Sequence, residues 1–429
     1  MRVRLVKNNL GTALAIAAAV ALSTLSVGQA GAEPVSIEYW HINSPTFGGP
    51  AVQELVRLFE SRHPQIKVVE KFQPGVYTGL MQQLQVALAA RRPPAVAQIG
   101  YNLTAYAAGQ FPHVTLDKYR RSDPEFFTGI PTNIIALGEL SGQLHGIPFG
   151  VSTPVTYYNP EIFRAAGLDP DRPPRTWDEV QRMGLVIKQK TGKFAVYLQQ
   201  PNDEWIDQTL IWGNGGQPLS GDGRHVGWDS SEAIEAMQMW QDMVHKTKIA
   251  ASLTWEEGIQ AFLSGQIAMC MTTIGRQEHM RKNANGFDVR SVPVPRFGTK
   301  PLATATGGNV LMIFATDPAQ EAAAWEWIKF LLSPEGATIW TKGTGYLPPR
   351  AALAEDPRYL KPFFDQAPLM KAALQTFPYA KPWVSFPGPR GLEITKTLIK
   401  ARDEVLEGKR PAAIILKEAV QQADAMLPR

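Results

Sequence analysis

Strand and helix patterns alternate along this chain, and the alternation limits its fold more than any other feature. Val35–Trp40 and Ile66–Lys71 have the composition of strands, and residues 50–62 between them carry apolar side chains at helical spacing. A helix rich in Leu and Gln at 77–90 and a short buried strand at 95–99 follow. This β-α-β-α-β order predicts a mostly parallel sheet, with a binding cleft at the carboxyl ends of its strands.

The later part of the chain continues the alternation. Helices are predicted at 255–264 and 318–332, and strands at 265–272 and 310–314. A length of 429 residues predicts two α/β domains, each a mostly parallel sheet flanked by helices. The 34 prolines are dispersed rather than gathered in one linker, which argues against two independent domains on a string.

The N-terminus has the pattern of a secretory signal peptide. Arg2, Arg4 and Lys7 precede an apolar stretch at 13–27, and Ala30-Gly31-Ala32 fits a cleavage site. Residues 1–32 are therefore predicted to be removed after about Ala32; a retained signal anchor is the alternative. No Cys follows the apolar stretch, so we expect an exported periplasmic protein without a lipid anchor.

Charge and cysteine content narrow the classes of partner. The chain has 43 Lys and Arg against 39 Asp and Glu, and three of the basic residues lie in 1–32, so the remainder has a net charge of +1. No long basic run is present, and we expect no nucleic-acid partner. The single cysteine, Cys270, lies in an apolar run typical of a buried strand and is predicted to be structural.

The usual signatures of catalysis, metal binding and cofactor binding are missing. The seven histidines show no HxH, HExxH or HxxxH spacing, and no G-x-S-x-G, Walker A or G-x-G-x-x-G motif occurs. Adjacent acids at Asp203-Glu204 and Glu256-Glu257 are interpreted as solvated surface rather than as the facing pair that a glycosidase needs. We therefore expect no enzyme, no metal and no cofactor.

One segment, beginning at His145, suggests a family. It contains STPVTYYN at 152–159, AGLDP at 166–170 and PPRTW at 173–177. This run resembles the first inter-lobe crossover of the type-1 extracytoplasmic solute-binding proteins, the capture subunits of ABC importers. Within that family it is most similar to the periplasmic glycerol-3-phosphate-binding proteins, and the resemblance covers essentially the whole chain after the signal.

The resemblance implies a two-lobed periplasmic-binding-protein fold of type II, like that of maltose-binding protein. Lobe one would comprise 33–150 plus 303–347, and lobe two 151–302 plus 348–429. Three crossings between the lobes would be hinges, for which the candidates are 148–154, 300–308 and 345–350.

Eight ligand-binding residues are implied by the same resemblance. Tyr77 matches a polyol-contacting Tyr, Ser152 a hinge hydroxyl, Thr273 a position that is usually Ser, and Gly308 a backbone N–H donor. Trp205 matches one of two cleft tryptophans, and Tyr346 and Arg390 match the residues that hold a phosphate. Tyr101 stands where the family has a Glu that binds glycerol hydroxyls, and Asn202 stands in place of the second Trp.

Both departures, Tyr101 and Asn202, lie at the polyol end of the implied site. We therefore expect a phosphate end that is kept and an organic end that is altered, which suits glycerol-3-phosphate or a glycerophosphodiester such as glycerophosphocholine, with Tyr101 facing the quaternary ammonium. The expected partners are this small molecule and the transmembrane subunits of an ABC permease, with the protein as a monomer.

Two other functions stay open from the sequence. One is a capture protein for an unphosphorylated sugar, with Trp205, Trp212 and Tyr101 as stacking platforms. The other, more remote, is a secreted carbohydrate-active enzyme, which would need a carboxylate pair inside the cleft.

Overall fold

Two five-stranded sheets organise the protein, whose computed structural model describes residues 33–199 and 203–428. The first sheet has the order β2-β1-β3-β13-β6, built from β1 (Val35–His41), β2 (Ile66–Phe72), β3 (Val96–Gly100), β6 (Ile147–Ser152) and β13 (Gly307–Ile313). β1 pairs in parallel with β2 and β3, whereas β13 runs antiparallel to β3 and β6. Four of the five strands therefore share one direction, as a mostly parallel sheet requires.

The second sheet repeats this plan with different segments. Its order is β11-β7-β10-β8-β9, from β7 (Pro154–Tyr158), β8 (Phe194–Leu198), β9 (Ala250–Ala251), β10 (Ile267–Thr273) and β11 (Arg290–Pro293). Here β7 is the strand that runs against the others. Cys270 is buried in β10 with a free thiol, which confirms its structural role as a core residue.

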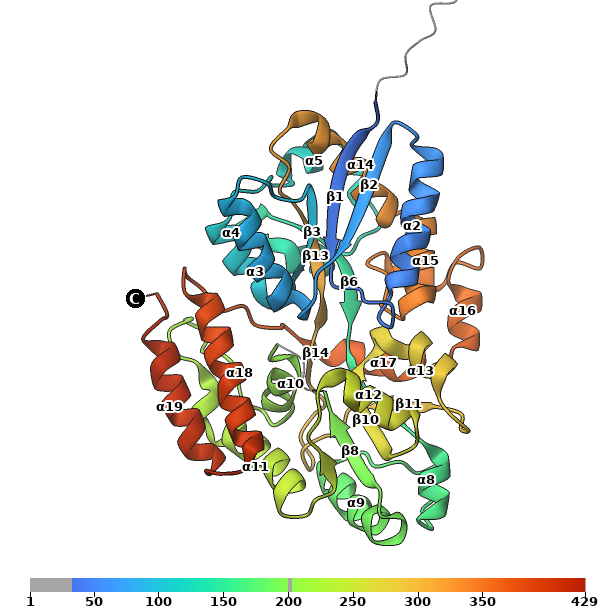
Figure 1. Cartoon of the computed structure of the whole chain (residues 1–429), viewed down its shortest axis with the longest axis vertical. Coiled ribbons are helices and arrows are strands. Elements are labelled where there is room, and N and C mark those ends of the chain that lie inside the picture. Colours follow the sequence, from blue (N-terminus) through green and yellow to red (C-terminus); the bar gives the residue numbers. More distant parts are fainter. Residues whose placement is uncertain (1–32, 200–202, 429) are drawn as a thin grey trace, which may run out of the picture. The chain divides into compact units, whose positions relative to one another are not determined.

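Helices cover the faces of the first sheet (Figure 1). α2 (Gly49–Arg62) and α15 (Pro334–Thr344) lie on one side, and α3 (Val76–Ala89) and α4 (Thr104–Gln110) on the other, while α14 (Pro318–Leu331) packs on β1. The apolar stripe Val52, Leu55 and Phe59 of α2 is buried, which is the helical face that the sequence pattern predicts. Short elements complete this region: α5 (Asp117–Ser122), α6 (Pro124–Phe127), α7 (Thr132–Ile135), β4 (Glu139–Leu140) and β5 (Gln143–Leu144).

The second sheet is flanked in the same manner. α9 (Trp177–Thr191) packs on β8 and opens with a capping box between Thr176 and Glu179, which satisfies free N–H groups of its first turn. The remaining helices here are α8 (Pro160–Ala165), α10 (Trp205–Gly213), α11 (Ser231–His245), α12 (Trp255–Leu263), α13 (Gln277–Asn283), α16 (Lys361–Gln366) and α17 (Met370–Thr376).

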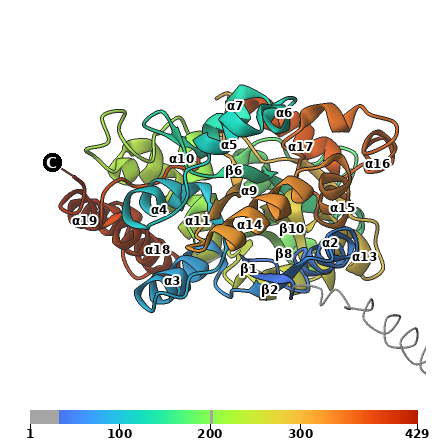
Figure 2. The same cartoon turned by 90° about the horizontal axis from the view of Figure 1, so that it is seen from above.

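The C-terminal helices add a separate layer. α18 (Gly391–Glu407) and α19 (Ala412–Asp424) lie side by side and pack on α11 (Figure 2). α18 buries the guanidinium of Arg402, which donates to the Asp203 carbonyl oxygen at 2.9 Å. The C-terminal layer is thereby tied to the chain that leads into α10.

Three chain segments pass together from one sheet to the other. β6 ends at Ser152 and β7 begins at Pro154, so a single residue separates strands of different sheets. Gly307 of β13 is paired with Ser152, and Leu347 N donates to Val151 O at 2.8 Å. β12 (Thr304–Ala305) pairs with β14 (Ala380–Lys381) beside them. These segments overlap the three predicted hinges, which, like the predicted lobe boundaries, remain proposals.

The helices and strands predicted from the alternating sequence pattern are confirmed, and their ends in the structure lie within three residues of the predicted ends. β13 is the largest departure: it begins at Gly307 rather than at 310, because two glycines extend the pairing with β6. Within the described residues, no helix combines the length and the apolar character needed to cross a membrane. The predicted signal peptide and Asn202 lie outside the described residues.

Candidate functional site

The carboxyl ends of the parallel strands of both sheets meet around one inner cavity. Its lining includes the residues after β1, β8 and β10 and the first residues of β13, which runs in the opposite direction. The lining side chains and glycines are Ile42, Phe47, Val76, Tyr77, Ser152, Gln199, Asp203, Trp205, Trp255, Thr273, Gly307, Gly308, Tyr346 and Trp383. The cavity volume is about 20 Å³, which is room for a water molecule and not for a polyol.

Six of the eight predicted site residues line this cavity: Tyr77, Ser152, Trp205, Thr273, Gly308 and Tyr346. They come from segments up to about 270 residues apart, and the fold brings them together at the ends of the strands. Tyr101 and Arg390 are not among the lining residues.

Two hydroxyls mark the point where the sheets meet. Thr273 Oγ1, at the end of β10, lies 3.4 Å from Ser152 Oγ, at the end of β6. The Thr273 hydroxyl also accepts from Gly275 N at 3.0 Å, and both side chains are buried. Because each hydroxyl keeps hydrogen-bonding capacity on the cavity side, the pair can bind a polar ligand group.

The tyrosines surround the glycine-rich start of β13. Tyr77 OH accepts from Asn309 Nδ2 at 2.9 Å, and Tyr101 OH donates to Gly150 O at 3.0 Å, behind Gly308. Tyr346 follows the left-handed Gly345 that ends α15, and its ring stacks on Trp340 with centroids 5.5 Å apart. Burial raises the pKa of all three phenols above the ordinary value, so they act as neutral hydrogen-bonding groups.

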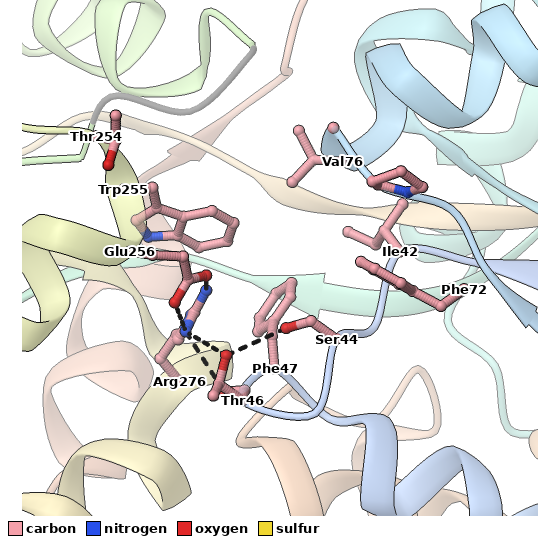
Figure 3. Close-up of a pocket in the computed structure, with 12 residues that line it drawn as sticks. Ile42, Ser44, Thr46, Phe47, Phe72, Val76, Thr254, Trp255, Glu256 and Arg276 are labelled. Carbon is pink, nitrogen blue, oxygen red and sulfur yellow. Dashed lines mark hydrogen bonds and ion pairs between the residues drawn. The ribbon is translucent and has the colours of Figure 1, made fainter.

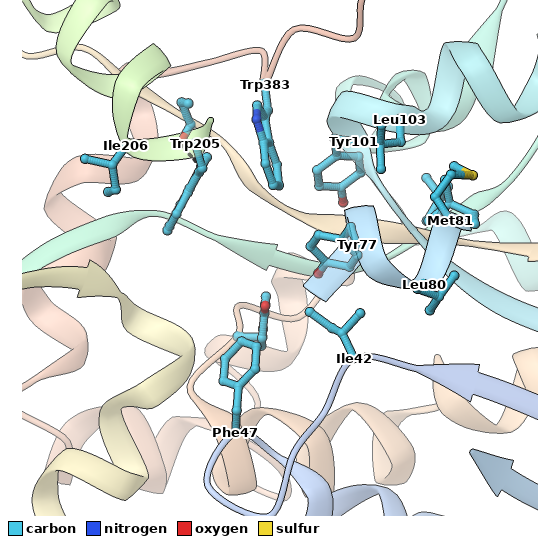
Figure 4. Close-up of a cluster of buried hydrophobic side chains, with 14 of the residues drawn as sticks. Ile42, Phe47, Tyr77, Leu80, Met81, Tyr101, Leu103, Trp205, Ile206 and Trp383 are labelled. Carbon is cyan, nitrogen blue, oxygen red and sulfur yellow. Dashed lines mark hydrogen bonds between the residues drawn. The ribbon is translucent and has the colours of Figure 1, made fainter. Parts of the chain in front are cut away.

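Two tryptophans form one wall of the inner cavity (Figure 4). Trp205, the first residue of α10, is anchored by its indole N–H, which donates to Ala305 O at 3.1 Å. The ring of Trp383 lies 6.1 Å from that of Trp205 and 6.0 Å from that of Tyr77, measured between centroids. Trp383 was missed from the sequence, because it lies in a Pro-rich loop far from every other wall residue.

Arg390 lies outside the cavity. It precedes α18, its side chain is 51% exposed, and its guanidinium donates to Glu393 at 2.8 and 3.0 Å. Glu393 is within reach because a residue three positions along a helix lies on the same face. The side chain therefore has a surface partner in this structure.

The acids Asp203 and Glu204 are buried, which corrects their interpretation as solvated surface. Asp203 is 5% exposed and lines the inner cavity, and Glu204 is fully buried. Burial raises the pKa of Asp203 to about 7 and that of Glu204 to about 8, with a further increase for Glu204 from the nearby Asp203. Glu204 Oε1 accepts from Asn102 Nδ2 at 3.1 Å, a contact between segments that follow the two sheets. No local sequence signal separates a buried acid pair of this kind from an exposed one.

A larger cavity of about 520 Å³ opens beside the inner one and shares four of its lining residues (Figure 3). Arg276 lines it with its side chain fully buried, stacked 4.3 Å from the Trp255 ring and 5.1 Å from the Phe47 ring. Its guanidinium is paired with Glu256 and donates to Thr46 Oγ1 at 3.2 Å. We call this larger cavity the mouth; Glu256, interpreted as solvated surface, is 55% exposed but is held in this ion pair.

Comparison with known proteins identifies the family of this chain. Residues 54–372, most of the chain, match the family model described as bacterial extracellular solute-binding protein. The chain belongs to this family. Its members are solute-binding proteins, which is the class that the resemblance of the STPVTYYN segment indicates.

Full-length relatives refine the placement within the solute-binding family. The sn-glycerol-3-phosphate-binding periplasmic protein UgpB of Pectobacterium atrosepticum is 26% identical, over 96% of this chain and 95% of its own. UgpB of Escherichia coli K12 is also 26% identical, over 96% of this chain and 97% of its own. The predicted similarity to glycerol-3-phosphate-binding proteins is thereby confirmed as a similarity.

Solved structures confirm the two-lobed fold like that of maltose-binding protein. UgpB of Mycobacterium tuberculosis in complex with glycerophosphocholine superimposes with a TM-score of 0.80 at 22% identity, covering 92% of this chain and 98% of that one. Maltose-bound MalE3 of T. maritima superimposes with a TM-score of 0.82 at 22% identity, covering 92% of this chain and 100% of that one. At this identity the likeness establishes the fold alone.

Proposed function

We propose that this protein is the periplasmic substrate-binding subunit of an ABC importer. In this proposal it captures sn-glycerol-3-phosphate or a glycerophosphodiester such as glycerophosphocholine, acts as a monomer, and delivers the ligand to the permease without chemistry. The observation that carries the proposal is the similarity to UgpB proteins along 96% of the chain, with six predicted contact residues around one cavity.

Capture requires the two sheets to move apart. The inner cavity holds about 20 Å³, so a ligand enters only in a more open arrangement and is then enclosed from both sides. Ligand contacts made only in the closed form shift the population toward closure by their differential binding energy. Ser152 and Thr273, which end strands of different sheets, are the proposed hydroxyl contacts on the two sides of the hinge.

The phosphate is proposed to lie toward the mouth. Among the described residues that line the mouth, Arg276 is the one cation, and its buried guanidinium lies against the rings of Trp255 and Phe47. Arg390 keeps its predicted role only if its side chain leaves Glu393 and turns toward the cleft when the ligand binds. A guanidinium can bind phosphate in bidentate fashion, which for Arg276 requires that Glu256 leave its ion pair.

A sugar is the second candidate ligand. Trp205, Trp255 and Trp383 give the cavities aromatic walls, which cover the C–H faces of sugars. Trp212, the other predicted platform, lies elsewhere: its indole N–H donates to Pro382 O, and it lines neither cavity. The remote enzymatic alternative would have to use Asp203 and Glu256, which line different cavities, and Glu256 is paired with Arg276.

Calorimetric titration of residues 33–429 tests the proposal, with glycerol-3-phosphate, glycerophosphocholine and maltose as ligands at moderate salt. We expect binding heat with a phosphorylated compound and none with maltose. Binding of maltose alone would make the protein a sugar-capture subunit and would contradict the proposed phosphate end.

A further inference from the structure

The carboxyl group of Asp203 has an unused oxygen in the inner cavity. The side chain is 95% buried, given its 5% exposure, and it lines the cavity. Trp205 N donates to Oδ1 at 3.1 Å, and across residues 33–199 and 203–428 no other hydrogen bond to this carboxyl group is present. Oδ2 is thus available to a ligand.

Three aromatic side chains, Tyr77, Trp205 and Trp383, line the same cavity as Asp203 and lie near one another (Figure 4). Trp383 is inclined to Trp205 by 44° and to Tyr77 by 67°, so the three rings do not stack on one another. Among the described residues that line the inner cavity, none is Lys, Arg or His. The lining therefore offers negative ring faces and one carboxyl group, with no cation to balance them.

The surroundings of Asp203 hold a surplus of acids. Among the described residues, Glu204 Oε2 and Asp207 Oδ1 are buried and have no hydrogen-bond partner, and Arg402 is the cation that contacts Asp207. Arg402 donates to Asp207 Oδ2 at 3.4 Å and is also paired with Asp403, so its charge is shared among several carboxylates. The surrounding carboxyl groups therefore favour the binding of a positively charged group here and disfavour that of a negatively charged one.

We propose that the inner cavity is a subsite for a cationic head group, held by Asp203 among the faces of Tyr77, Trp205 and Trp383. This inference rests on the proposed function and narrows its ligand class to a zwitterionic phosphodiester with a quaternary ammonium group. In a more open arrangement than this one, whose inner cavity holds about 20 Å³, the ammonium end would lie inside and the phosphate toward Arg276 at the mouth. Ring faces and a buried carboxylate are the groups that recognise such a cation.

The ionisation of Asp203 fits this role. In the ligand-free cavity, burial raises its pKa to about 7; the Trp205 N–H and Arg402 oppose the increase, and Asp207 adds to it. The other titratable groups facing it are Glu204 on the same segment and the phenols of Tyr77 and Tyr346. A cation entering the cavity favours the ionised form, so affinity for the cation rises as pH increases from about 6 to 8.

Tetramethylammonium probes the subsite without requiring a phosphorylated ligand. Trp fluorescence of residues 33–429 is followed during titration with tetramethylammonium chloride, with tert-butanol as an uncharged control of similar size, at pH 6 and pH 8. We expect saturable binding of the cation alone, several-fold tighter at pH 8. Asp203→Asn should weaken it by about tenfold or more, whereas Asp222→Asn at the exposed surface should not.

Two phosphodiesters then locate the cation in the complete ligand. We expect the wild type to bind glycerophosphocholine at least about tenfold more tightly than glycerophosphoglycerol, and Asp203→Asn to reduce that preference. Equal affinities in the wild type, or no saturable response to tetramethylammonium at pH 8, would overturn the subsite. Response to tetramethylammonium without binding of either phosphodiester would leave the subsite standing and refute the proposed function. The wild-type comparisons stand even if Asp203→Asn does not fold.

Discussion

At the scale of single residues, backbone geometry alone accounts for the presence of glycine at position 308, without reference to a ligand. Its φ is +124°, and a Cβ atom there would lie 1.8 Å from Gly150 O and 3.1 Å from Tyr101 Cε2. Glycine is needed because the start of β13 approaches β6 and Tyr101 closely. A role in ligand binding, which the resemblance implies, is an addition to this packing requirement.

Replacing Gly308 by Ala should therefore destabilise the protein even without ligand. We expect a loss of at least about 1–3 kcal/mol in the free energy of unfolding, measured by urea denaturation, because both strain and overlap oppose the side chain. Gly109→Ala is the matched control, since a Cβ at this exposed helical position meets no atom within 4 Å. Equal stability of wild type and Gly308→Ala would show that β13 relaxes without cost.

Arg390 is the predicted contact whose position differs most from expectation. If the side chain turns inward when the ligand binds, Arg390→Ala should weaken binding of glycerol-3-phosphate by about 10- to 100-fold, the cost of a charge-assisted hydrogen-bond pair. Arg358→Ala removes an exposed arginine paired with Asp356 and should leave the calorimetric affinity unchanged. Unchanged affinity of Arg390→Ala would assign the phosphate to another group, with Arg276 at the mouth as the nearest cation.

At the scale of elements, the order of strands and helices could be predicted from the sequence, whereas the residues that line the cavity could be predicted only in part. The alternation of β1, α2, β2, α3 and β3 follows from local periodicity, which a sequence displays directly. The contacts of Trp383 with Tyr77 and Trp205 join segments about 180 to 300 residues apart, and no local pattern encodes them. Six cavity residues were identified through the family motifs rather than through physical reasoning.

The chain entering α10 shows the same limit. In the sequence, Asp203 and Glu204 have the pattern of exposed acids, but both are buried in the structure. Arg402 of α18 donates to the Asp203 carbonyl oxygen, a long-range contact that no local pattern predicts. Their raised pKa values are a consequence of this burial, since loss of water destabilises the charged form.

The buried acids should make the ligand-free protein less stable as pH rises. Burial raises the pKa of Asp203 from 3.8 to about 7 and that of Glu204 from 4.5 to about 8. Between the lower and higher values, the folded protein holds protons that the unfolded chain has lost, so the free energy of unfolding falls with pH until both acids ionise. An increase of one in pKa corresponds to about 1.4 kcal/mol.

Calorimetric melting from pH 5 to pH 8.5 measures this effect. We expect Glu204→Gln to flatten the fall in melting temperature relative to wild type, because one of the two groups no longer ionises. Asp222→Asn, at an exposed position, should keep the wild-type slope. Parallel curves for wild type and Glu204→Gln would mean that Glu204 ionises as easily in the folded protein as in the unfolded chain.

At the scale of the whole molecule, the proposed capture mechanism implies that contacts between the two sheet regions set the balance between open and closed forms. Arg276 and Glu256 belong to the second region, whereas Thr46 and Phe47 follow β1 of the first. The guanidinium lies between the Phe47 and Trp255 rings and donates to Thr46, so separation of the regions must break these contacts.

Arg276→Gln should shift the ligand-free population toward the open form. Loss of the cation–π and hydrogen-bond contacts favours opening by roughly tenfold, which small-angle X-ray scattering detects as a larger radius of gyration. Arg290→Gln is the control, because Arg290 pairs with Asp171 within one region. A radius equal to that of the wild type would show that Arg276 does not hold the regions together.

The central claim is that a phosphorylated glycerol compound is captured in the cavity between the two sheets. The most direct measurement is a crystal structure of residues 33–429 grown with glycerophosphocholine. We expect ligand density enclosed by Tyr77, Ser152, Trp205 and Thr273, with its phosphate toward the mouth. Density in a different cavity, such as the one lined by Tyr158, Arg175 and Arg296, would contradict it.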